Sequence, residues 1–229
     1  MSSAILQCIA IVTMMIDHIG FRLFPGVDVL RMIGRIAFPL FAFMLAEGFV
    51  HTSSRKNYLL RLGIFALVSE IPYQIFRYGP FWTEYVAYDF NLWSNIFFEL
   101  ILIFVALWFL ELSKKKGAFL VIGPAGAIAM AVLAYRVDTM YGAYGVLMGI
   151  CFYLFREKRW LAILSLAVLT AGYCFYHQNW LQFYAIVAAI PIWQYNGKRG
   201  PRLPRYFSYA FYPAHLLVIY GLYWMLQTL

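Results

Sequence analysis

Apolar runs long enough to cross a lipid bilayer constrain this chain more than any other feature of its sequence. A transmembrane helix needs about 20 mostly apolar residues to span roughly 30 Å of hydrocarbon. Such runs can be drawn at 5–24, 29–51, 57–77, 92–112, 117–135, 141–156, 159–176, 179–195 and 207–228. The fifth run, interrupted by glycine and proline, and the short sixth would also suit a tilted or re-entrant segment. The runs predict an all-α, polytopic integral membrane protein with about nine transmembrane helices, in the range of roughly eight to ten.

The composition excludes an ordinary soluble domain with a polar surface. Of the 229 residues, 64% are hydrophobic and 12% are charged, and the mean hydropathy is +0.73. No long linker or internal repeat divides the chain, so residues 1–229 are expected to form a single transmembrane domain. The first run contains Asp17 and His18, with no basic residue before it and no small-residue cleavage site after it. We therefore expect it to be a retained helix and not a cleaved signal peptide.

The basic residues predict which ends of the helices face the cytoplasm, because loops rich in Lys and Arg remain inside. The connections after the second, fourth, sixth and eighth runs hold thirteen: Arg55, Lys56, Arg61, Lys114, Lys115, Lys116, Arg156, Lys158, Arg159, Lys198, Arg199, Arg202 and Arg205. The odd-numbered connections and their borders hold four: Arg22, Arg31, Arg77 and Arg136. The amino terminus is therefore expected in the cytoplasm of a multi-pass protein of the inner or cell membrane. This basic rim suits anionic membrane lipid or the phosphates of a cytosolic donor, so the net charge of +8 needs no nucleic-acid partner.

Ionisable residues inside the apolar runs are the strongest functional signal. Asp17 and His18 lie in the first run, and Arg31, Arg35 and Glu47 lie in the second. Such groups are costly in hydrocarbon, so a cluster of them indicates a functional site. Histidine can accept a proton near neutral pH, which makes His18 the first candidate for a catalytic base. The alternative is a set of charge pairs that only hold helices together.

The polar groups are expected to concentrate in the outer half of the membrane. The third run adds Glu70, and the fourth adds Asn95 and Glu99. Asp17 is about 100° around its helix from His18, so it is expected to pair with an arginine of the second helix. Pro39 and Pro72 fall inside runs, where they free carbonyl groups and permit kinks. The pattern predicts a polar cavity open to, or just beneath, the outer face.

Several classes of site have no support in the sequence. The chain lacks a Walker loop, HExxH, GxSxG and paired cysteines, so ATPase, hydrolase and zinc-binding functions are not indicated, and no metal is expected. Cys8, Cys151 and Cys174 each lie in an apolar run and are expected to be small core residues. The aromatic segment 77–91 suits the headgroup level of the outer leaflet or, alternatively, a lip that binds the acceptor.

Four blocks of sequence, in order, resemble the TraX family, which is known for N-acetylation of conjugative pilin. They are IAIVTMMIDHIG, LRMIGRIAFPLFAFMLAEGFVHT, NYLLRLGIFALVSEIPYQ and FSYAFYPAHLL, with weaker blocks at SNIFFEL and VDTMYGAYGVL. The family is similar, more distantly, to acyltransferase type 3 proteins and heparan acetyltransferases. Those proteins take acetyl-coenzyme A from the cytoplasm and acetylate an acceptor on the far side of the membrane. The spacing of the two arginines in RMIGR differs somewhat from theirs.

The resemblance implies an O- or N-acetyltransferase that moves acetyl from acetyl-CoA to an exported peptide or glycan. It implies His18 as the catalytic base, tuned by Asp17, Arg22 and Glu70, with transfer either direct or through an acetyl-histidine. The substrate or oxyanion contacts expected from it are Arg31, Arg35, Asn95, Glu70 and Glu99. The donor-binding residues expected are Arg55, Lys56, Arg61 and His215, although His215 could equally be a second catalytic residue or a core histidine.

Two other functions are compatible with buried charges. A small-molecule or proton-coupled transporter also carries them, although the inverted repeats common in transporters are not visible here. A non-catalytic partner of a peptide or pilus export system is the third hypothesis.

Overall fold

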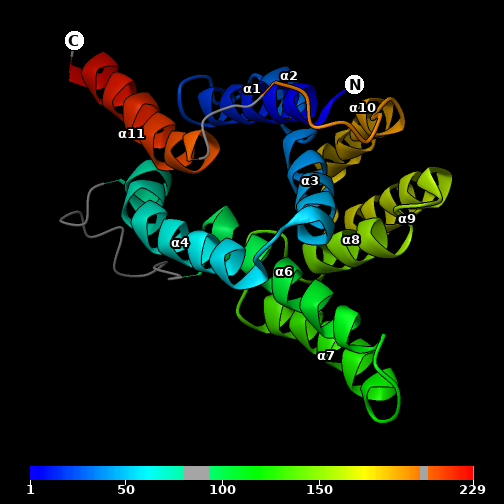
Figure 1. The fold of residues 1–229 in the computed structure, drawn as a ribbon. Helices are drawn as coiled ribbons and strands as arrows, with labels where there is room; N and C mark the ends of the chain where they lie inside the picture. Colours follow the sequence, from blue (N-terminus) through cyan, green and yellow to red (C-terminus); the bar gives the residue numbers. More distant parts are fainter. Residues whose placement is uncertain (80–92, 202–205, 229) are drawn as a thin grey trace.

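The computed structural model describes residues 1–79, 93–201 and 206–228, and within these all regular structure is helical. The first half contains α1 (Ser3–Arg22), α2 (Asp28–Gly34), α3 (Ala37–His51) and α4 (Arg55–Tyr78). The second half contains α6 (Ile96–Leu112), α7 (Phe119–Arg136), α8 (Gly142–Leu154), α9 (Arg159–His177), the 3-10 helix η1 (Trp180–Ala188), α10 (Ala189–Trp193) and α11 (Phe207–Thr228), as shown in Figure 1. Each predicted apolar run coincides with helix. Most of the aromatic segment 77–91 lies outside the described residues.

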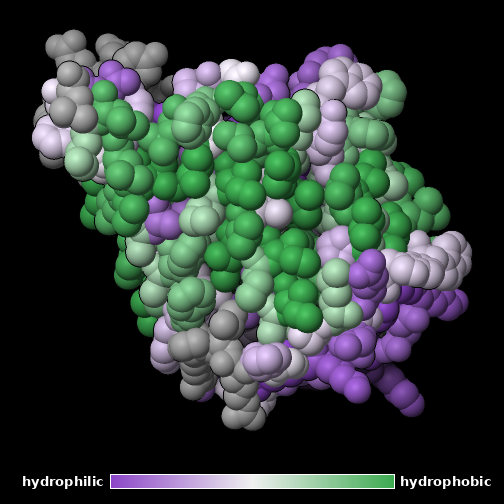
Figure 2. All heavy atoms as spheres, turned by 90° about the horizontal axis from the view of Figure 1, so that it is seen from above, coloured by the Kyte–Doolittle hydropathy of each residue, from purple (hydrophilic) through white to green (hydrophobic). Residues whose placement is uncertain are grey.

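Five helical spans of the described chain are long and apolar enough to cross a membrane: α1, α2 together with α3, α4, α7 and α9. Their outward surfaces carry large apolar side chains such as Leu67, Val121 and Val168, each more than half exposed. Figure 2 shows that apolar residues cover much of one face of the molecule, with hydrophilic residues gathered mainly along its edges. Such a surface is far more apolar than that of a soluble monomer.

The second apolar run was expected to be one helix, and the structure corrects this. Helix α2 ends at Gly34, and α3 begins at Ala37 after a turn at Arg35 and Ile36. The cause is Pro39, whose ring nitrogen cannot donate to the carbonyl of Arg35 and whose ring crowds that carbonyl. The interruption places Arg35 at the end of α2, where its amide donates to the carbonyls of Arg31 (3.1 Å) and Met32 (3.3 Å).

The less regular apolar runs adopt different helical forms. The glycine-rich fifth run is a continuous helix, α7, in which a Cβ at Gly126 would lie 2.4 Å from the Phe109 ring. Small residues there let α7 approach α6 closely. The sixth run forms only the 13 residues of α8. The eighth run begins as a 3-10 helix, η1, before it continues as α10.

Segments from the two ends of the chain pack together. Helix α11 contacts both α4 and α1 (Figure 1). The start of α1 is held by the connection after α10, because the amides of Ser3 and Ala4 donate to the carbonyls of Lys198 (2.9 Å) and Arg199 (3.0 Å). These bonds satisfy amide groups that a helix start leaves without an intrahelical partner. The arrangement brings the polar residues of α11 against those of α1.

Candidate functional site

Two cavities lie at opposite ends of the helix bundle. The near cavity, named for its position beside the amino terminus, has a volume of about 960 Å³ and is lined by residues from Ser3 at the start of α1 to Tyr212 on α11. The far cavity has a volume of about 680 Å³ and is lined from the other end of α1, where Asp17 and His18 lie. Its other walls come from the second half of α2, the start of α3, the end of α4 and the connection between α7 and α8, and they include Tyr173 on α9, Gln182 on η1 and Tyr212 on α11.

The two cavities share one wall. Four side chains line both of them: Met14, Phe41, Ile96 and Tyr212. These side chains come from α1, α3, α6 and α11, so the wall lies in the middle of the bundle. His18 follows Met14 by one helical turn and lies on the same side of α1. The histidine is therefore placed just beyond the wall, on the far-cavity side.

Asp17 holds two arginines in the far cavity. Its Oδ2 accepts from Arg31 Nη1 at 2.8 Å, and its Oδ1 accepts from Arg35 Nη2 at 2.5 Å. The aspartate is buried. The expected pairing of Asp17 with an arginine of the second run is confirmed, and both arginines take part. Close packing enforces the arrangement, because a Cβ at Gly34 would lie 2.2 Å from Asp17 Cβ.

His18 forms a pair with His215 on α11, whereas Asp17 binds the two arginines. His18 Nδ1 lies 2.7 Å from His215 Nε2, although the two residues are 197 positions apart. Their rings are stacked with centroids 4.9 Å apart. On its other side, the His215 ring places Nδ1 2.8 Å from the carbonyl oxygen of Phe211.

When both rings are neutral, the carbonyl of Phe211 fixes their tautomers. A carbonyl oxygen only accepts, so His215 Nδ1 carries the hydrogen and its Nε2 is an acceptor. His18 Nδ1 then donates to His215 Nε2. The remaining nitrogen, His18 Nε2, is left with a lone pair and can accept a proton. His215 thus orients His18 in the way that a carboxylate orients the histidine of a hydrolase triad.

Arg22 does not join this histidine pair. Its guanidinium lies over the rings of Tyr223 (4.1 Å) and Tyr220 (5.2 Å) on α11. The residues that do surround the His18 ring are aromatic, with Phe76 at 5.2 Å and Tyr212 at 6.3 Å between centroids. The predicted tuning of His18 by Arg22 therefore has no direct contact to support it.

Three predicted substrate residues lie outside the walls of both cavities. Glu70 accepts from Gln74 Nε2 (2.7 Å) and from Asn95 Nδ2 (2.5 Å). Asn95 also caps α6 by accepting from the amide of Phe97 at 3.1 Å. Glu99 lies elsewhere on α6, fully buried, and its Oε2 accepts from Thr139 Oγ1 at 2.5 Å. These groups connect helices, and Glu99 also holds the connection that lines the far cavity.

The basic residues predicted to bind the donor do not lie together in the structure. Arg61 lines the near cavity, whereas Arg55 pairs with Glu111 at 3.3 Å and Lys56 lies outside both cavity walls. Glu111 also accepts from Lys114, and this hydrogen bond raises the pKa of Lys114 above its ordinary value. Glu111 and its basic partners therefore tie the start of α4 to the end of α6.

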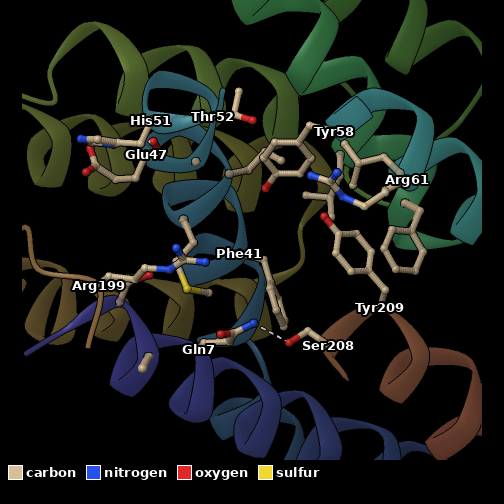
Figure 3. Close-up of a pocket in the computed structure, with 18 of the residues that line it drawn as sticks. Gln7, Phe41, Glu47, His51, Thr52, Tyr58, Arg61, Arg199, Ser208 and Tyr209 are labelled. Carbon is tan, nitrogen blue, oxygen red and sulfur yellow. Dashed lines mark hydrogen bonds between the residues drawn. The ribbon is translucent and has the colours of Figure 1, made fainter. Parts of the chain in front are cut away.

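Figure 3 shows what faces the near cavity. Arg61 and Arg199 reach into the space from opposite sides, with the Tyr58 and Tyr209 rings beside Arg61. The Arg61 guanidinium lies 5.2 Å from the centre of the Tyr58 ring. Below them, Gln7 Nε2 donates to Ser208 Oγ and joins α1 to α11. Two cations, one of them beside aromatic rings, suit a ligand that carries both phosphates and an aromatic base.

Sequence reasoning missed Arg199, Tyr209 and Tyr212 as lining residues. Arg199 was visible as one of the basic residues in its connection, and Tyr209 and Tyr212 fall inside the FSYAFYPAHLL block. No periodicity could have indicated that they meet residues of α1 and α4. The contact between His18 and His215 could not be predicted from the sequence for the same reason.

Comparison with known proteins places the chain in a family. The family model described as TraX protein matches residues 2–223. The chain belongs to the TraX family. A probable fimbrial assembly protein, FimC of serogroup H1, from Dichelobacter nodosus is 27% identical over 240 residues, which cover 93% of this chain and 92% of that relative.

A second relative of this TraX-family chain matches over a shorter stretch. An uncharacterised protein, RP591, of Rickettsia prowazekii (strain Madrid E) is 44% identical over 45 residues, which cover 20% of this chain and 18% of the relative. No solved structure matches the chain. The whole-length matches confirm the resemblance that the sequence blocks indicate, and they link the family to fimbrial assembly through the name of one relative.

Proposed function

We propose that this protein is a multi-pass acetyltransferase of the bacterial cell membrane, with the near cavity open to the cytoplasm. The five long apolar helices and the apolar outer surface support the membrane location. The basic connections support the orientation, because the near cavity is lined by residues such as Arg61 and Arg199 that belong to the Lys- and Arg-rich side. The far cavity then opens toward the outer face.

One observation carries the proposed chemistry: the cavities meet at a shared wall, and a histidine with an available nitrogen lies directly beyond it. Acetyl-coenzyme A has phosphates at one end and a thioester at the other, joined by a thin arm about as long as half the hydrocarbon thickness. In the proposal, Arg61 and Arg199 bind the phosphates in the near cavity. The arm passes between Met14 and Phe41, and the thioester reaches His18.

In this proposal His18 is the general base. Its Nε2 takes the proton of the acceptor's amine or hydroxyl as that group attacks the thioester carbonyl. The carbon–sulfur bond then breaks, the new amide or ester bond remains, and the leaving thiolate receives the proton from His18. Arg31 and Arg35 each use part of a guanidinium on Asp17, so their other N–H groups can stabilise the oxyanion. His215 keeps His18 in the required tautomer.

The name of the Dichelobacter relative favours a peptide acceptor over a glycan. That relative is a probable fimbrial assembly protein, and fimbriae are built from exported protein subunits. We therefore propose the amino group of an exported subunit as the preferred acceptor, with a sugar hydroxyl as the second choice. The aromatic side chains of the far cavity, including Tyr73 and Tyr141, can pack against either.

The test measures thiol release from acetyl-coenzyme A by the purified protein in the presence of a peptide amine. His18→Ala should lower turnover about 100- to 10,000-fold, the usual effect of losing a general base. His215→Ala should lower it less and shift its pH profile, because that residue acts through His18. His177→Ala is the matched control, since His177 lies at the end of α9, outside both cavity walls, and it should behave as wild type.

A competing function predicts a different result. The two cavities that meet at one wall could also form a transport path with that wall as its gate. A transporter would show no donor binding and no thiol release, while flux in vesicles would depend on Phe41 and Tyr212.

Equal thiol release by wild type and His18→Ala would remove His18 from the mechanism.

A further inference from the structure

The far cavity contains more positive than negative side chains. Arg31, Arg35 and Arg77 line it together with the carboxylates of Asp17 and Asp138. Asp17 is already shared between two of the arginines. Arg77 lies in the last turn of α4, and within the described residues it makes no ion pair with a carboxylate.

One aromatic ring brings Arg77 and Arg31 together. Each of these guanidinium groups lies 4.9 Å from the centre of the Phe21 ring. Attraction to the face of the ring holds both cations near it despite their mutual repulsion. The forked N–H groups of arginine match a carboxylate, so Arg77 can provide two donors for one.

We propose that Arg77, positioned with Arg31 on the Phe21 ring, binds a carboxylate of the acceptor. The ligand is a peptide with an acidic side chain close to its reacting amino group. This inference rests on the proposed function for the identity of the acceptor, but the binding site itself does not require turnover. Arg77 serves as a specificity residue, because it contacts the substrate away from the reacting atoms.

A simpler role for Arg77 is to stabilise the end of its helix, since a cation in the last turn interacts well with the helix dipole. Arg22 supplies the matched control. It also lies in the last turn of a long apolar helix and also stacks on aromatic rings, but it lines neither cavity. If Arg77 only stabilises a helix end, substitution of Arg77 and of Arg22 should have similar consequences. If Arg77 binds a carboxylate, only its substitution should change the preference for an acidic acceptor.

The experiment compares two amidated tripeptides, Ala-Asp-Ala and Ala-Asn-Ala, as acceptors. Wild type should prefer the acidic peptide in kcat/KM by about tenfold or more, as expected for a charge-assisted hydrogen bond. Arg77→Gln should lose this preference, and Arg77→Lys should keep only part of it, because lysine retains the charge but not the forked donors. Arg22→Gln should keep the full preference. Equal preference in wild type and Arg77→Gln, or its loss in Arg22→Gln, would overturn the proposal.

A binding measurement separates this inference from the proposed function. Peptide binding to the detergent-solubilised protein is followed by tryptophan fluorescence without any donor, while donor hydrolysis is measured without any peptide. Selective binding of the acidic peptide that disappears in Arg77→Gln supports the site even if no thioester is cleaved. Donor hydrolysis at the wild-type rate in Arg77→Gln, with unselective peptide binding in wild type, supports the enzyme and rejects the site.

Discussion

Two buried polar clusters in this protein arise from the same sequence pattern but face different surroundings. The cavity cluster consists of Asp17, Arg31 and Arg35, and the closed cluster consists of Glu70, Gln74 and Asn95. In the cavity cluster, one carboxylate serves two guanidinium groups and leaves part of each directed to a cavity. In the closed cluster, Glu70 and Asn95 bind each other, the neighbouring side chain and the α4 and α6 backbones, and they do not line either cavity.

The difference separates buried polar groups that bond only to other parts of the protein from those that also line a cavity. Hydrogen bonds of the closed cluster are directed at other parts of the protein, so they hold α4 against α6. The cavity cluster lines the far cavity with guanidinium groups that are only partly used on Asp17, and it lies beside the His18 and His215 pair. A buried polar group is therefore a good candidate for a site when it lines a cavity and still has unused donors or acceptors. Burial of a charge alone does not identify a site.

Removing the charge of Asp17 should have the largest effect on the comparison. Asp17→Asn leaves two guanidinium groups close together without their shared counter-ion. Breaking a buried ion pair in this way costs about 3–5 kcal/mol. We expect a large fall in the midpoint of thermal unfolding in detergent, together with the loss of acetyl transfer.

A second substitution shows whether unpaired charge is the cause. Asp17→Asn combined with Arg35→Met removes one of the two unpaired cations and should recover a large part of the stability. Transfer should not recover, because the second variant also removes oxyanion donors. If Asp17→Asn alone unfolds at the wild-type temperature, the ion pairs are not what holds α1 against α2.

A methyl group placed between the helices should have the next largest effect. Gly34→Ala puts a Cβ 2.2 Å from Asp17 Cβ and Oδ1, so α1 and α2 must separate. Overpacking of this kind costs about 1–3 kcal/mol.

Gly63→Ala is the matched control, because nothing lies within 4 Å of its Cβ. It should be neutral or slightly stabilising, since alanine favours helix by about 1 kcal/mol over glycine. Thermal unfolding and thiol release of both variants check this, and equal behaviour would contradict the tight contact at Gly34.

The sequence predicted helix positions well because each apolar run reports its own length and location. It also predicted the pairing of Asp17 with the second run, since the helical angle between Asp17 and His18 directs the two side chains to different neighbours. The turn at Arg35 was within reach, because the effect of Pro39 on the carbonyl four residues earlier is local.

Contacts between distant segments lay beyond the sequence. His215 meets His18 only because α11 packs against both α1 and α4, and no spacing within one helix contains that information. The same limit explains why Glu70, Asn95 and Glu99 resembled Asp17 in the sequence. Each is an ionisable or polar residue in an apolar run, and only tertiary packing decides which of them reaches a cavity.

The closed cluster supplies the smallest predicted effect. Glu70→Gln keeps the shape of the side chain and one acceptor oxygen, so it weakens one of the hydrogen bonds from Gln74 and Asn95. The expected loss of stability is about 1 kcal/mol, the typical net value of one hydrogen bond. Turnover and KM for acetyl-coenzyme A and for the acceptor should stay at wild-type values, because Glu70 does not line either cavity. A large fall in kcat with unchanged unfolding temperature would show that the closed cluster acts on the reaction, and the distinction between the two clusters would then fail.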